Sequence, residues 1–368
     1  MIKARSIRQH AAWRIAAGML LFSAGCAACA AEPPRYEIDA VLDTSGHRIT
    51  ATQKLTYTNN ADSALSEVYF HIYPHRRYAP KEIKSMYRFG SYFKVNPFPE
   101  GFQSGDLKIR SVSGSRGPLT YIIEGEDQTL LRVSLDQPLL PGRSQDIQIA
   151  FDVDIPHVHN RFGWHDGIIT LTRWHPMVSV FDQEGWHRYP FYIYHQPFFS
   201  DAAQYRLSLR LPADQTVVSG CSLKEEKANS DGTKTLVLES DAPMRDLGLS
   251  VSARFSCFVR EEKGFQIRSY YIDGTVRAAE EAAGHAAAIM DFYARRFGAY
   301  PYRQFSIAPS FLGFGGDQSS GMVFLNTRLY RLPGFLRRYF DFLVSHETGH
   351  QWFYNLIGSD EYREMFVD

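Results

Sequence analysis

The chain has few cysteines, no net charge and no long apolar run beyond its first 31 residues. Only 4 of its 368 residues are cysteine, and neither Cys221 nor Cys257 has another cysteine at the spacing of metal ligands. Its 40 basic residues balance 40 acidic ones, so no net field favours nucleic acid or an anionic membrane surface as a partner. A hydrophobic content of 44% over this length predicts a globular protein with two or three packed domains.

The N-terminus has the pattern of a secretion signal. Four basic residues, Lys3, Arg5, Arg8 and Arg14, precede an apolar run over residues 15–31. We therefore expect residues 1–31 to be a signal peptide and the protein to be exported, as a periplasmic or secreted protein. Two cleavage sites compete: the small residues 28–31 suit ordinary signal peptidase, and Cys26 suits a lipoprotein, which a lipid anchor would hold at the membrane. The run is shorter than the ~20 residues of a spanning helix.

Export would place Cys221 and Cys257 in an oxidising compartment, where they could form a disulfide. The alternative is that each is a small buried residue in its own strand. The sequence leaves both readings open.

Residues 32–260 predict a β-domain. Short alternating runs are separated by Pro, Gly, Asn and Asp clusters with no helix between them, which favours a β-saddle or sandwich. The predicted strands are Arg48–Tyr57, Ser66–Tyr73, Leu107–Val112, Leu130–Leu135, Asp146–Val153, Tyr205–Leu211 and Lys234–Glu239.

The pattern changes near residue 260, so residues 261–368 are predicted as a second, α+β domain. Strand Phe265–Tyr271 precedes a helix over Val276–Phe297, which has apolar residues at helical spacing. There follow a strand (Tyr302–Pro309), a Gly-rich loop (Phe311–Ser320), a strand (Gly321–Asn326) and a helix (Gly334–Ile357) between Pro333 and Gly358.

The last predicted helix contains the sequence H-E-x-x-H, formed by His346, Glu347 and His350. Residues one helical turn apart share a face, so the two imidazoles can converge on one Zn²⁺. The carboxylate of Glu347 can act as general base on a water that zinc acidifies, which predicts peptide hydrolysis. A catalytic zinc normally has a third protein ligand. Phe353 and Leu356 stand where H-E-x-x-H-x-x-G-x-x-H sites have Gly and His, so that class is excluded and the third ligand lies elsewhere.

The residues after His350, Gln351-Trp352-Phe353, resemble the aminopeptidase N (alanyl aminopeptidase) family of gluzincins. In that family eighteen residues separate the second His of H-E-x-x-H-Q-W-F from a ligand Glu. In this chain the eighteenth residue is Asp368, so the expected ligand is the next residue and the chain is expected to end within the catalytic domain.

The resemblance extends through most of the chain that follows the predicted signal. Three segments of the first domain carry it: Val68–Pro74, Trp174–His187 and Pro197–Asp201. It implies an N-terminal β-saddle followed by the first part of a thermolysin-like catalytic domain, with zinc as cofactor and a peptide as substrate. The family also uses a tyrosine farther downstream to stabilise the oxyanion.

A second family motif, of the G-x-M-E-N type, matches Gly315-Gly316-Asp317-Gln318 with two departures. The motif's glutamate, which binds the substrate's α-amine, is replaced by Gln318, and Asp317 stands at the methionine position. The resemblance implies that Gly316 and Gln318 contact substrate, while the alternative is a Gly-rich loop leading to an edge strand. Since successive strand residues point to opposite faces, we expect Asp317 to point away from a substrate facing Gln318.

Other polar residues are weaker candidates. A His-rich stretch shows no pair at ligand spacing on a strand face, which argues against a second metal site; it comprises His157, His159, His165, His175, His187 and His195. Glu361, Glu364 and Asp368 are expected to be surface charges, or alternatively stand-in ligands, and Asp360 is expected to cap a following helix.

Two functions follow from these patterns. The first is an exported bacterial zinc aminopeptidase, with His346 and His350 as ligands and Glu347 as base. The alternative is a truncated, non-catalytic chain that acts as a peptide-binding or structural module.

Overall fold

A computed structural model of the chain describes residues 32–193 and 198–367, and Pro33–Asp368 belong to one compact unit. The predicted signal peptide with Cys26, and also His195, Pro197 and Asp368, lie outside the described residues. Within the described part, no helix has the length and apolar character needed to cross a membrane.

The largest sheet contains eight strands in the order β16-β17-β14-β1-β2-β8-β4-β5. Its strands are β1 (Arg35–Asp43), β2 (Arg48–Thr58), β4 (Asp106–Gly114), β5 (Gly117–Pro118), β8 (Ser144–Asp154), β14 (Gln204–Pro212), β16 (Ser222–Ala228) and β17 (Thr233–Glu239). Neighbouring strands are antiparallel except for β1 and β14. Buried residues alternate along β2, as expected for a sheet with one face on the core.

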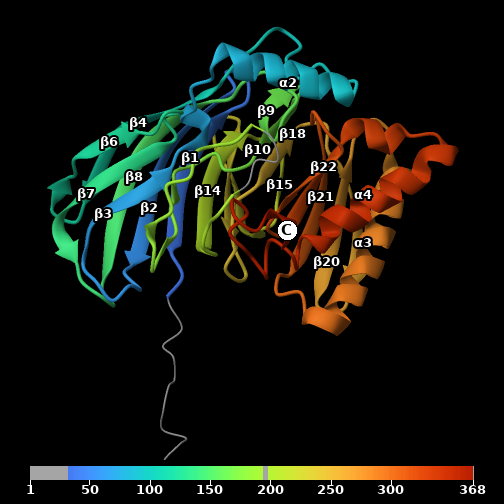
Figure 1. Cartoon of the computed structure of the whole chain (residues 1–368). Helices are drawn as coiled ribbons and strands as arrows, with labels where there is room; N and C mark the ends of the chain where they lie inside the picture. Colours follow the sequence, from blue (N-terminus) through green and yellow to red (C-terminus); the bar gives the residue numbers. More distant parts are fainter. Residues whose placement is uncertain (1–31, 194–197, 368) are drawn as a thin grey trace, which may run out of the picture. The chain divides into compact units, whose positions relative to one another are not determined.

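Two four-stranded sheets and a short hairpin complete the β-rich part, which Figure 1 shows in blue to yellow. One sheet contains β11 (Met177–Val178), β3 (Leu65–His71), β7 (Leu130–Leu139) and β6 (Tyr121–Glu124). The other contains β15 (Thr216–Ser219), β18 (Leu249–Ser252), β10 (Ile168–Leu171) and β9 (Phe162–His165). The hairpin is β12 (Phe181–Asp182) with β13 (Gly185–Trp186). Trp174 is fully buried in the shared core, and its indole donates to the Leu247 carbonyl at 3.1 Å.

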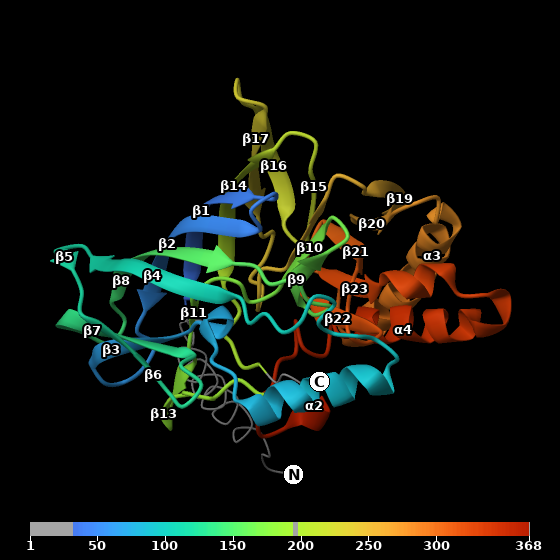
Figure 2. The same ribbon diagram turned by 90° about the horizontal axis from the view of Figure 1, so that it is seen from above.

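The C-terminal part is a five-stranded mixed sheet covered by helices. Its order is β19 (Ser256–Glu262), β20 (Phe265–Tyr271), β21 (Gln304–Ser310), β23 (Met322–Asn326) and the edge strand β22 (Gly316–Ser319). The helical elements are α3 (Val276–Phe297), η2 (Thr327–Arg331), η3 (Gly334–Leu336) and α4 (Arg337–Gly349), followed by η4 (Met365–Val367). α3 and α4 lie side by side in both views (Figures 1 and 2).

Alanines explain how closely α3 approaches its neighbours. Its buried stripe consists of Met290 and six alanines, at positions 278, 279, 282, 283, 286 and 287. Small side chains at helical spacing allow a helix to pack closely against a sheet and a second helix. The central strands β21 and β23 are parallel to each other and nearly continuously buried, as a strand covered on both faces should be.

The structure confirms the predicted β-rich architecture, and α3 has the predicted bounds. It differs at α2 (Pro80–Tyr92), because no helix was expected among the first strands. Two local signals favour this helix: Pro80 occupies its first turn, and the carboxylate of Glu82 accepts the Ala79 N–H at 2.8 Å. In both views α2 extends toward α4 (Figures 1 and 2). The predicted division at residue 260 stays a prediction.

Two further predictions near the H-E-x-x-H motif were wrong. Part of the expected loop Phe311–Ser320 is the strand β22, whose Gly316 pairs with Leu325 of β23. The expected helix Gly334–Ile357 is α-helical only over Arg337–Gly349. Turns begin at His350, and Tyr354 has a φ of 117°. In this segment Trp352 is fully buried and stacks on Tyr293 of α3.

Buried histidines predict a loss of stability in acid. Burial lowers the pKa of His71 and of His175 to about 4, from 6.5. Unfolding therefore takes up a proton at each, and the free energy of unfolding falls as pH decreases from about 6.5 toward 4. Between pH 7 and pH 5 each should contribute a loss of about 2 kcal/mol.

Urea unfolding at both pH values tests this, with a His175→Gln variant expected to lose about 2 kcal/mol of the pH dependence. His285→Gln is the control, because the His285 side chain is 42% exposed. Equal pH dependence in the His175 variant and the wild type would count against the assignment.

Candidate metal centre

The two histidines of the motif converge at the end of α4. Their Nε2 atoms are 3.3 Å apart, and their rings are nearly perpendicular, at 80°. Two nitrogens bound about 2.0 Å from a tetrahedral zinc lie about 3.3 Å apart. His346 and His350 therefore fit as two ligands of one zinc ion.

Hydrogen bonding orients the His350 ring for such a role. Its Nδ1 lies 3.1 Å from the Phe353 carbonyl oxygen, which can only accept a hydrogen bond. Nδ1 must then carry the hydrogen, which leaves the Nε2 lone pair available to a metal. The early end of α4 makes this bond possible, because the turn after Gly349 brings the Phe353 carbonyl back to the ring.

Glu347 is held between α4 and β22. It is 4% exposed, and a Cβ built on Gly316 would lie 2.5 Å from its Oε1 and 2.8 Å from its Cδ. Only glycine at position 316 leaves room for the carboxylate in this position. Gly316 thus contributes to the site by its lack of a side chain.

The described residues contain no group of three or more His, Cys, Asp or Glu side chains placed to bind one metal ion. The structure therefore provides two nitrogen ligands and identifies no third ligand in residues 32–193 and 198–367. Of the expected surface carboxylates, Glu364 is exposed, whereas Glu361 is buried and accepts the Phe198 N–H at 2.8 Å. Asp360 caps a turn by accepting the Tyr362 N–H at 3.0 Å, and no α-helix follows it.

All five residues singled out in the sequence, His346, Glu347, His350, Gly316 and Gln318, line one cavity of about 490 Å³. This is within the size range of sites for small ligands. α2 supplies much of its apolar wall, through Met86, Phe89 and Gly90 and the following Phe93 and Pro97. Sequence reasoning missed this wall because it missed the helix.

Arg161, which no sequence signal marked, joins Asp317 in this cavity. Their Nη2 and Oδ1 atoms are 3.1 Å apart, and the Asp317 side chain is 1% exposed against 15% for Arg161. Burial raises the pKa of Asp317, and the charge of Arg161 opposes that effect. Asp317 is buried and Gln318 is half-buried, as expected for successive strand residues on opposite faces, and both residues contribute to the cavity wall.

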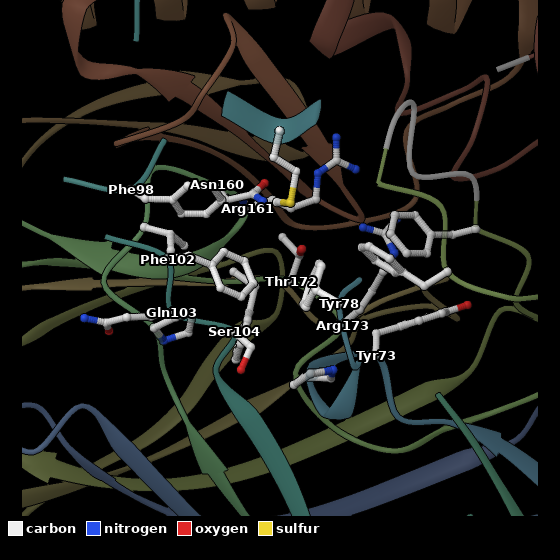
Figure 3. A pocket seen from close by; sticks show the side chains of 17 residues that line it. Tyr73, Tyr78, Phe98, Phe102, Gln103, Ser104, Asn160, Arg161, Thr172 and Arg173 are labelled. Atoms are coloured by element: carbon white, nitrogen blue, oxygen red, sulfur yellow. The ribbon is translucent and has the colours of Figure 1, made fainter. Parts of the chain in front are cut away.

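A second, smaller cavity of about 50 Å³ is shown in Figure 3. It shares Met86, Asn160, Arg161 and Phe198 with the wall of the first cavity. Aromatic rings dominate its wall, among them Tyr73, Tyr78, Phe98 and Phe102. Arg161 lines both cavities, and Arg173 lines this one with its guanidinium carbon 3.3 Å from the Phe198 ring centroid. The half-buried Arg161 is thus shared by the two cavities, whereas the buried Arg173 belongs to the second one only.

Three histidines of the His-rich stretch come together, and one of them, His159, also lines the cavity beside α4. The Nε2 of His157 is 2.9 Å from Nδ1 of His165, and the His159 and His165 rings are 4.3 Å apart. They do not form a metal-binding group in the described chain. His175 and His187 lie elsewhere, bonded to Gln53 and Asp182.

Cys221 and Cys257 are both free thiols, the first buried and the second exposed. The possible disulfide between them is therefore not formed. Burial raises the pKa of the Cys221 thiol, which keeps it protonated at neutral pH.

No protein-family model and no curated protein matches the sequence. Among solved structures, the fold is similar to an M1 zinc metallopeptidase from Deinococcus radiodurans, with a TM-score of 0.62 and 14% identity over 91% of this chain and 67% of that one. A two-domain M1 zinc metallopeptidase variant bound to L-arginine gives a TM-score of 0.60 at the same identity and coverage. A Deinococcus radiodurans variant bound to a Tyr-Ser-Ala substrate gives 0.58, again at 14% identity and the same coverage. The fold is therefore an N-terminal β-domain followed by part of an M1-type catalytic domain.

The contact between Gly316 and Glu347 predicts that Gly316→Ala is destabilising. The added methyl group must displace the Glu347 carboxylate or move β22 away from α4. Overpacking of this kind lowers the free energy of unfolding by about 1–3 kcal/mol. Urea unfolding should show this loss, with Gly284→Ala as the control because nothing lies within 4 Å of a Cβ at that position of α3. An unchanged free energy of unfolding in Gly316→Ala would show that the carboxylate is not held there.

Proposed function

We propose that this chain carries the active-site base and two zinc ligands of an exported metallopeptidase that removes residues from the N-terminus of peptides. The observation that carries the proposal is the 3.3 Å approach of the His346 and His350 Nε2 atoms, beside a buried Glu347. The H-E-x-x-H-Q-W-F resemblance and the fold shared with M1 zinc metallopeptidases support it. The neighbours bound to L-arginine and to Tyr-Ser-Ala support a peptide as the substrate.

Each residue has a defined role in this proposal. When bound, zinc supplies Lewis acidity that acidifies water and polarises a carbonyl group. His346 and His350 hold it, and the Phe353 carbonyl fixes the ring of His350. The Glu347 carboxylate takes the proton of the attacking water and returns it to the leaving amine. Gln351, next to His350, keeps the motif aligned with β22 through its bond to the Ser319 carbonyl.

Substitutions of the proposed zinc ligands and of the proposed base should affect zinc binding and peptide hydrolysis separately. His346→Ala and His350→Ala should each weaken zinc binding by more than about 100-fold, since even a residue that only orients a ligand typically contributes 10–100-fold. Glu347→Gln should retain zinc and lose on the order of 10²–10⁴-fold in turnover, the usual contribution of a general base. Metal analysis and hydrolysis of aminoacyl substrates measure the two effects, with His285→Ala as the control.

The alternative, a non-catalytic peptide-binding module, predicts a different result. Zinc binding would be weak, and chelators would readily remove the metal. Substitution of His346, Glu347 or His350 would not change the affinity for peptides. If the wild type binds zinc tightly but hydrolyses no peptide, the enzymatic proposal is rejected.

A further inference from the structure

We infer that Arg173, in the β-rich part, and Tyr354, in the turn after α4, are positioning residues for His350. The inference rests on the proposed function, in which His350 is a zinc ligand, and goes beyond it by naming what holds that ligand in place. Arg173 lies between β10 and β11, and 181 positions separate it from Tyr354. Their contact therefore joins the two parts of the chain.

Both residues have a backbone conformation that residues with a Cβ rarely adopt. The φ angle is 50° at Arg173 and 117° at Tyr354, and each residue is only 4% exposed. The other described non-glycine residues with a positive φ are half-buried or exposed: His47, Lys94, Gln128, Asp166 and Asp273. A residue persists in such a conformation only where its surroundings hold it there. The two buried cases in the described chain are thus in contact with each other.

Arg173 holds the side chain of Tyr354. Its Nη2 donates to the Tyr354 hydroxyl oxygen at 2.9 Å. The guanidinium group is itself held on two further sides, since Nη2 lies 4.0 Å from Oδ2 of Asp246 and the central carbon lies 3.3 Å from the ring centroid of Phe198. Movement of either side chain would break a buried hydrogen bond and leave its polar groups unsatisfied, which is costly.

The φ angle of Tyr354 determines the direction of the Phe353 carbonyl group. This carbonyl belongs to the planar peptide group between Phe353 and Tyr354, and φ is the rotation of that group about the N–Cα bond of Tyr354. With the Tyr354 side chain held by Arg173, a change of φ to the usual negative range would turn the carbonyl away. Because the Phe353 carbonyl oxygen lies 3.1 Å from Nδ1 of His350, the ring of His350 would lose its hydrogen-bond acceptor.

Glycine at position 354 would not need this support, because glycine adopts a positive φ readily. The turn also has backbone hydrogen bonds of its own: the Asn355 N–H donates to the His350 carbonyl at 3.1 Å, and the Tyr354 N–H donates to the Ile357 carbonyl at 3.1 Å. The bond from Arg173 therefore compensates for a side chain at a position whose conformation suits glycine. The requirement for Arg173 should disappear when Tyr354 is replaced by glycine.

The tautomer of His350 in the metal-free full chain tests the inference directly. Nitrogen NMR of the chain labelled with ¹⁵N-histidine, at about pH 8 where histidine is neutral, distinguishes the two tautomers. We expect the hydrogen on Nδ1 in the wild type and a mixture of tautomers in Tyr354→Phe, which lacks only the hydroxyl. Tyr330→Phe is the matched control and should keep the wild-type tautomer, because Tyr330 is 5% exposed and its hydroxyl has no hydrogen-bond partner among the described residues.

Zinc affinity, measured by competition with a chromophoric chelator, provides the second readout. Tyr354→Phe should weaken zinc binding by about 10–100-fold, the usual effect of losing a group that orients a ligand, and Tyr330→Phe should leave it unchanged. Arg173→Lys keeps a positive charge beside Asp246 but lacks the planar fork of donors, so it should weaken zinc binding by a similar factor. In a Tyr354→Gly background, Arg173→Lys should cause no further loss.

A Tyr354→Phe variant with the tautomer and the zinc affinity of the wild type would overturn the inference. So would an Arg173→Lys substitution that weakens zinc binding equally with tyrosine or glycine at position 354, because Arg173 would then act on the fold as a whole. If Tyr354→Gly does not fold by circular dichroism, the comparison of Tyr354→Phe with Tyr330→Phe decides alone. Failure of the wild type to bind zinc would instead reject the proposed function, since the tautomer is measured without metal.

Discussion

The site depends on the buried side-chain amide of Gln351, which joins the end of α4 to the turn between β22 and β23. Its Oε1 accepts the Gly321 N–H at 2.8 Å, and its Nε2 donates to the Ser319 carbonyl at 3.0 Å. A fully buried amide that lost one of these partners would leave an unsatisfied polar group, which is costly. The bonds therefore fix the separation of the helix from β22, and this separation presses Glu347 against Gly316.

The same turn is held from its other side by the β-rich part of the chain. Asp246 accepts the Ser319 hydroxyl at 3.0 Å and the Ser320 N–H at 2.8 Å. Gly220 and Gly248 allow the close approach, because a Cβ at either position would overlap Ser320 or Ser319. The strand β22 beside α4 is thus positioned by residues more than seventy positions earlier, so the β-rich part is a structural component of the candidate site.

Sequence patterns predicted the elements whose formation depends on neighbouring residues in the chain. Alternation marked the strands, and the alanine stripe marked α3 with the observed bounds. The H-E-x-x-H spacing predicted that His346 and His350 share one helical face. The early end of α4 is accompanied instead by the burial of Trp352 against Tyr293, a tertiary contact that a helical pattern cannot show. The Arg161–Asp317 pair joins residues 156 positions apart, and nothing in either local sequence indicates it.

This pair explains how a carboxylate is accommodated at position 317. A buried carboxylate left at position 317 without a counter-charge would be destabilising, so the presence of Asp317 requires a cation nearby. The protein supplies that cation from the segment between β8 and β9, next to Asn160, which lines the same cavity. The cavity wall thus combines α4, α2 and the segment that precedes β9, three elements that are far apart in the sequence.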